Sequence, residues 1–119
     1  MTPANRLILA HIWVAIIAFG LGAMMAVMQA LARAGIELPF GTARLYYLSV
    51  TAHGVLEALV FTTFFIMALG YVVADTTLGR IRGMGWAWGG FWVAVVGTVM
   101  TTLAILSGTS TVIYTFYPP

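Results

Sequence analysis

His53 and Glu57 are two ionisable side chains inside a long apolar segment that runs from Leu45 to Ala74. Burying such groups in a membrane is costly, so their presence indicates a functional site with a partner. A spacing of four residues places both side chains on one face of a helix, one turn apart. Imidazole is a common metal ligand, which makes His53 the first candidate for chemistry. The alternative is that both residues only hydrogen-bond each other or a neighbouring helix.

Two stripes of residues at helical spacing extend this candidate site. The face that carries His53 comprises Tyr46, Val50, His53 and Glu57. The preceding apolar segment carries a matching stripe of small and polar residues: Gly22, Ala26, Gln29 and Arg33. Two antiparallel helices can pack these stripes face to face, with His53 and Ala26 each about 10 Å from the outer end of its stripe. The small side chain of Ala26 then leaves room for a bulky group beside the imidazole.

The composition excludes several classes of protein. Of the 119 residues, 62% are hydrophobic and 7% are charged, so the chain cannot cover the surface of a water-soluble monomer. The missing surface must be membrane lipid or other protein. The five basic residues are all arginines and are too sparse for a nucleic-acid partner. The absence of cysteine excludes disulfides, thiolate metal sites and thioether-linked haem.

Three apolar segments predict an all-α integral membrane protein whose residues 1–119 form a single membrane unit. The predicted transmembrane helices cover about residues 7–32, 46–74 and 83–107. Three arginines on one side (Arg6, Arg80 and Arg82) against two on the other favour a cytoplasmic N-terminus. A cleavable signal peptide is the competing interpretation of the first segment, but the apolar run is about twice the usual length.

The other histidine, His11, lies near the inner end of the first predicted helix. Its depth differs from that of His53 by about 20 Å. Two ligands of one metal ion must lie within about 4 Å of each other, so the two histidines cannot share a metal. We therefore expect His11 to be an interfacial residue near the inner lipid headgroups.

Two sequence motifs resemble subunit I of the haem-copper oxidases. Residues 46–56 (YYLSVTAHGVL) resemble the start of helix II in that family, and residues 114–119 (YTFYPP) resemble the loop after helix III. Residues 29–31 and 33–34 are similar to the outer end of helix I. The resemblance covers nearly the whole chain and is greatest to the B-type branch, because of the His-Gly-Val-Leu sequence and the Pro-Pro ending.

The resemblance implies that the chain forms the first three helices of the subunit I bundle. It also implies that His53 is one axial ligand of the low-spin haem, of b or a type. The implied haem pocket is lined by Gly22, Ala26, Gln29, Arg33, Tyr46, Val50 and Glu57. Glu57 departs from the family pattern, which usually has an uncharged residue there. Its carboxyl group is either neutral and buried or paired with a group outside the sequence, so its role stays open.

Family members continue with further helices after the Pro-Pro loop, so the resemblance implies an N-terminal part of a longer or split subunit. The second haem and the copper site would lie beyond Pro119, and this chain alone would not be catalytically competent. The complete subunit would reduce oxygen to water and translocate protons in the plasma membrane of a prokaryote. Its implied partners are the remaining helices of subunit I, subunit II and an electron donor such as cytochrome c.

The sequence is also compatible with two other functions. A nitric oxide reductase resembles the same histidine region, and its sequence beyond Pro119 would carry acids around a non-haem iron instead of copper-binding histidines with a nearby tyrosine. A small three-helix scaffold protein without a cofactor is the alternative from another class.

Overall fold

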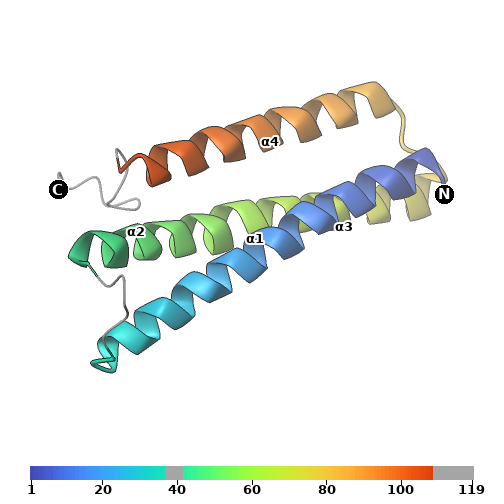
Figure 1. Cartoon of the computed structure of the whole chain (residues 1–119). Helices are drawn as coiled ribbons and strands as arrows, with labels where there is room; N and C mark the ends of the chain where they lie inside the picture. Colours follow the sequence, from blue (N-terminus) through green and yellow to red (C-terminus); the bar gives the residue numbers. More distant parts are fainter. Residues whose placement is uncertain (37–41, 109–119) are drawn as a thin grey trace.

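The structure is a computed structural model that describes residues 1–36 and 42–108, and every regular element in these ranges is a helix. The 114–119 motif lies outside the described residues. Helices α2, η1 and α3 follow one another without a break and form one long helix (Figure 1). The elements are α1 (Pro3–Arg33), α2 (Ala43–Gly54), the π-helix η1 (Val55–Phe61), α3 (Thr62–Leu78) and α4 (Met84–Leu106).

The three predicted transmembrane helices are confirmed. Within the described residues, three helices are long and apolar enough to cross a membrane: Pro3–Arg33, Ala43–Leu78 and Met84–Leu106. Large apolar side chains cover their outer surfaces, including Ile66, Val93 and Met100, each more than 60% exposed. Such a surface requires lipid or further protein around it.

The first two helices begin three to four residues earlier than predicted, because threonine side chains cap them. The Thr2 hydroxyl accepts a hydrogen bond from the Asn5 backbone N–H at 3.1 Å, and the Thr42 hydroxyl accepts one from Leu45 at 3.3 Å. These caps satisfy backbone donors that the first turn of a helix leaves free. Gly79, with φ of 69°, ends α3 in a left-handed conformation that glycine adopts without strain.

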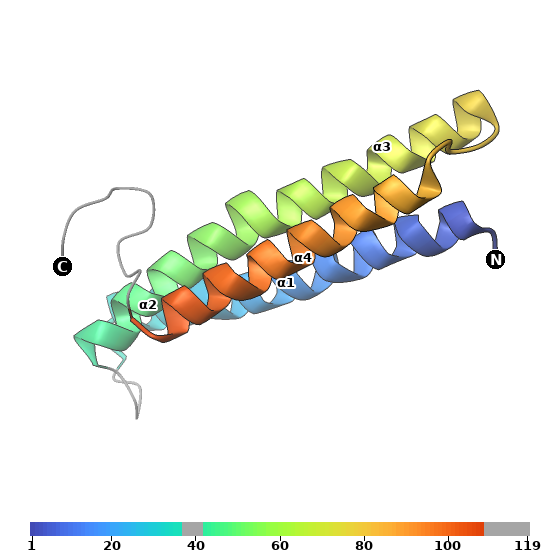
Figure 2. The same ribbon diagram turned by 90° about the horizontal axis from the view of Figure 1, so that it is seen from above.

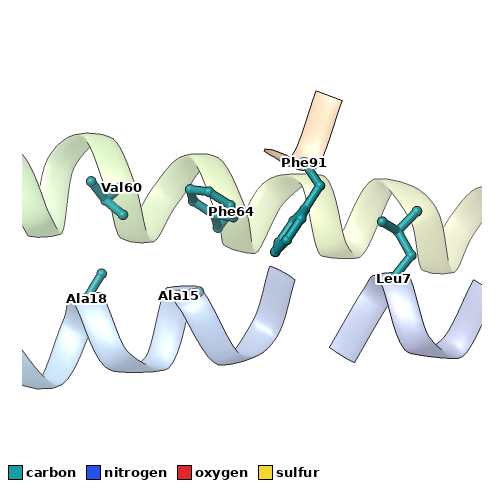
Figure 3. Packing of buried hydrophobic residues seen from close by; sticks show 6 residues of the cluster. All are labelled: Leu7, Ala15, Ala18, Val60, Phe64 and Phe91. Atoms are coloured by element: carbon teal, nitrogen blue, oxygen red, sulfur yellow. The ribbon is translucent and has the colours of Figure 1, made fainter. Parts of the chain in front are cut away.

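The long α2–η1–α3 helix packs antiparallel along α1, and α4 lies over the groove between α1 and α3 (Figures 1 and 2). Alanines on α1 face larger side chains on the second helix. The ring of Phe91 on α4 projects between α1 and α3, as Figure 3 shows. Without a hydrophobic driving force in lipid, this close packing is what holds transmembrane helices together. The buried cluster consists of Leu7, Ala15, Ala18, Val60, Phe64 and Phe91.

The prediction that His11 is an interfacial residue is wrong. The side chain is 2% exposed and lies where three helices meet. Its ring centroid is 4.9 Å from that of Phe91, 5.3 Å from that of Tyr71 and 5.7 Å from that of Phe64. The Nδ1–H donates a hydrogen bond of 2.9 Å to the Leu7 carbonyl oxygen. His11 belongs to the core because it follows Leu7 by four residues and so shares its face of α1.

Replacing Phe91 with alanine should lower the free energy of unfolding of the membrane-embedded subunit by about 3 kcal/mol. The ring touches both other helices, and its loss leaves a cavity beside His11. Trp92→Ala is the matched control. Trp92 is 58% exposed, so this substitution should lower the free energy of unfolding far less. Unfolding in mixed micelles of increasing SDS content, followed by circular dichroism, measures both variants. Equal losses for the two variants would contradict the assigned packing.

Candidate functional site

Polar contacts join α1 to α2 at the end of the bundle where α1 stops. The Nε–H of Arg33 donates a hydrogen bond of 3.0 Å to the Tyr46 hydroxyl oxygen. One turn deeper, the Gln29 amide nitrogen donates to the Ser49 carbonyl oxygen at 3.1 Å and to the Met25 carbonyl oxygen at 3.2 Å. The structure therefore brings the polar ends of the two predicted stripes together.

A third contact holds His53. Its Nδ1 lies 3.0 Å from the Gly22 carbonyl oxygen on α1. Because a carbonyl oxygen can only accept, Nδ1 carries the proton in this bond, and Nε2 of the neutral ring keeps its lone pair. Histidines that bind metals commonly donate their other ring N–H to a backbone carbonyl in this way. The half-buried His53 ring thus uses Nδ1 for this contact, which leaves Nε2 as the ring nitrogen that could bind a ligand.

The sequence predicted His53 to lie level with Ala26, whereas its observed contact is with the Gly22 carbonyl oxygen, four residues earlier on α1. A helical carbonyl points along the axis toward the residue four positions ahead, so the Gly22 oxygen points toward Ala26, the residue expected beside the imidazole. Ala26 and Val50 are half-buried. The polar partner of Gln29 is the Ser49 backbone, one residue before Val50.

Gly22 also lies against Glu57. A Cβ atom built at Gly22 would be 2.5 Å from Oε1 of Glu57 and 2.9 Å from its Cδ and Cγ atoms, which is too close for any real contact. The absence of a side chain at Gly22 therefore leaves the space that the end of the Glu57 side chain occupies against α1. In the described part of the chain, the Glu57 carboxyl group has no hydrogen bond or ion pair. Both alternatives for Glu57, a neutral buried carboxyl group or a partner outside the sequence, therefore stay open.

Two buried polar residues beside His53 were missed from the sequence. Ser49 is 3% exposed and Thr51 is 1% exposed. Each hydroxyl donates to a carbonyl of the preceding turn: Ser49 to Tyr46 at 2.7 Å and Thr51 to Tyr47 at 3.1 Å. Their polarity within an apolar segment was the available signal. These bonds satisfy the two hydroxyl groups inside the helix.

The π-helix was also missed. It begins at Val55, two residues after His53, and ends at Phe61. A π-turn joins each N–H to the carbonyl five residues back, and such turns occur frequently at functional sites. Glu57 lies inside it and still faces Gly22. The sequence contains no proline here that would have predicted the irregularity.

The histidine has no cluster of other metal ligands around it. Over residues 1–36 and 42–108, no three His, Cys, Asp or Glu residues come together that could hold a metal ion. A metal on His53 must therefore take its remaining ligands from a prosthetic group and from other parts of the molecule.

Comparison with known proteins agrees with this geometry. Residues 6–119 match the family described as Cytochrome C and Quinol oxidase polypeptide I. The chain belongs to this family. A relative, cytochrome c oxidase subunit 1 of Thermus thermophilus, is 42% identical over 82 residues, which are 69% of this chain and 14% of the relative. The chain thus spans only a small part of that relative's length. No solved structure matches the chain.

Membership of the oxidase polypeptide I family confirms the resemblance found in the sequence. It also agrees with the three helices that are long and apolar enough to cross a membrane. The matched region includes both stripes and the 114–119 motif.

The Gly22–Glu57 approach can be tested with a second glycine of α1. Gly22→Ala should lower the free energy of unfolding in SDS micelles by about 1–3 kcal/mol, because the added methyl group displaces the Glu57 side chain. Gly20→Ala is the control, since a Cβ atom there meets nothing within 4 Å. Adding Glu57→Ala to Gly22→Ala should restore most of the loss. If the double variant is no more stable than Gly22→Ala alone, the helices do not approach as described.

Proposed function

We propose that this chain forms the first three transmembrane helices of the catalytic subunit of a haem-copper terminal oxidase, with His53 Nε2 as one axial ligand of its low-spin haem, of b or a type. The observation that carries the proposal is the 3.0 Å contact between His53 Nδ1 and the Gly22 carbonyl oxygen. It fixes the tautomer and the direction of the ring before any metal is bound. When bound, the haem accepts and passes on single electrons.

The other residues of the two stripes position this ligand. Gln29 ties α1 to the backbone of α2 one turn before the histidine, so the two helices cannot slide past each other without losing the bond. Arg33 uses only its Nε for Tyr46, which leaves its terminal nitrogens for an anionic group at the haem edge. Gly22 leaves space for the end of the Glu57 side chain. The small or branched side chains of Ala26 and Val50 complete the pocket wall.

The complete subunit is proposed to contain the second haem and the copper site, and to reduce oxygen to water while translocating protons. The remaining helices of subunit I, subunit II and an electron donor such as cytochrome c are its proposed partners. The name of the Thermus thermophilus relative supports these proposals. A cofactor-free scaffold gives no reason for a membrane histidine whose Nδ1 bonds across to the neighbouring helix and leaves Nε2 without a partner among the described residues.

The proposed location is the plasma membrane of a prokaryote with the N-terminus in the cytoplasm. Three arginines lie at the end of the bundle where α1 begins, whereas Arg33 and Arg44 lie at the other end (Figure 1). This difference favours the first end as the cytoplasmic one. Trp86 at the start of α4 is 89% exposed at that end, as expected of an aromatic residue at the membrane boundary.

Replacing His53 with leucine in the complete oxidase should abolish the low-spin haem signal in reduced-minus-oxidised spectra of membranes. No neighbouring side chain can replace the lost coordinate bond, because residues one turn away lie about 5 Å along the axis. His11→Leu should keep the signal per assembled subunit, since His11 contacts aromatic rings and the Leu7 carbonyl. A low-spin haem signal that persists in the His53 variant would refute the assignment.

A further inference from the structure

An open hollow lies at the opposite end of the bundle from His53, between the start of α1 and the end of α3. Its volume is about 290 Å³. α1 begins and α3 ends at this end of the bundle (Figure 1). Because these are the ends of apolar helices long enough to cross a membrane, we infer that the hollow lies near the lipid headgroups. Its lining residues are Asn5, Ile8 and Leu9 from α1, and Val72, Asp75 and Thr76 from α3.

The hollow contains a half-buried acid without a cation. Over the residues that the structure describes, the Asp75 carboxylate has no hydrogen bond and no ion pair. The adjacent Thr76 hydroxyl does not serve it, because that group bonds to the carbonyl oxygens of Val72 at 2.9 Å and Val73 at 3.1 Å. A carboxylate with apolar walls beside it is stabilised by a cation that enters the hollow.

The charges around the hollow have the opposite sign. Arg6 follows Asn5 directly, and Arg80 and Arg82 follow the end of α3; all three side chains are exposed. This end of the bundle therefore presents one acid inside the hollow and several guanidinium groups outside it. Such a pattern complements a zwitterionic headgroup, with its phosphate toward the arginines and its ammonium toward Asp75.

We propose that this hollow binds one phospholipid whose headgroup carries a primary ammonium, the phosphatidylethanolamine class. The Asp75 carboxylate and the Asn5 amide oxygen can each accept an N–H bond from that ammonium, whereas a trimethylated choline headgroup has no N–H to donate. The apolar walls match the start of an acyl chain: Leu9 is 40% exposed and Val72 is 38% exposed. This site is independent of the proposed haem ligand.

Photo-crosslinking in the purified complete oxidase tests the site. The enzyme is delipidated in detergent and incubated with phosphatidylethanolamine or phosphatidylcholine that bears the same diazirine-labelled acyl chain. Mass spectrometry then counts crosslinks to peptides that contain Leu9 or Val72. We expect about tenfold more crosslinking by the ethanolamine lipid, the effect of one charge-assisted hydrogen bond.

Variants at Asp75 distinguish recognition of the lipid headgroup from binding of the acyl chain in the hollow. Asp75→Asn should reduce the ethanolamine signal to that of the choline lipid, and Asp75→Glu should retain the preference. Thr77→Val is the control, because the Thr77 hydroxyl bonds to the Val73 carbonyl and the residue does not line the hollow.

Equal crosslinking by both lipids in the unmodified enzyme overturns the proposal, as does a preference that survives Asp75→Asn. Absence of any crosslink, which would mean that protein fills the hollow, also overturns it. Loss of haem in any variant would bear on His53 and not on this site.

Discussion

The hydrogen bond between the His53 imidazole and the Gly22 carbonyl oxygen is the interaction on which the candidate site depends. It crosses from the second membrane helix to the first, and it leaves Nε2 as the ring nitrogen for the haem iron in the proposed function. In hydrocarbon no water competes for the imidazole N–H, so the nearest backbone acceptor decides the orientation of the ring. Gly22, which offers that acceptor, also leaves space for the end of the side chain of Glu57, one turn beyond His53 on the second helix.

Different contacts hold the helices together in the two halves of the bundle. In the half that contains His53, side chains such as Gln29 and Arg33 join helices by polar contacts. In the other half the helices are joined by aromatic packing around His11, with Phe91 between α1 and α3. The first arrangement fixes the register of the two helices that carry the site, and the second holds α4 against them.

Much of this arrangement could be predicted because helical spacing and membrane thickness are strong constraints. The two stripes placed Arg33 near Tyr46, as the structure has them. They placed His53 level with Ala26, whereas its contact is with Gly22, one turn earlier on α1. Other features depend on partners that a single helix does not reveal. The burial of His11 requires Phe91, which lies 80 positions later in the chain, although its spacing from Leu7 was a usable clue. The π-turn at Glu57 has no local sequence signature.

The most direct test of the account is a cryo-EM map of the complete oxidase at a resolution that shows the plane of each imidazole ring. The account predicts density for an iron about 2 Å from Nε2 of His53. The same map should show Nδ1 within hydrogen-bond distance of the Gly22 carbonyl oxygen. An iron bound through Nδ1, or a His53 ring turned away from α1 with no haem beside it, would contradict the account.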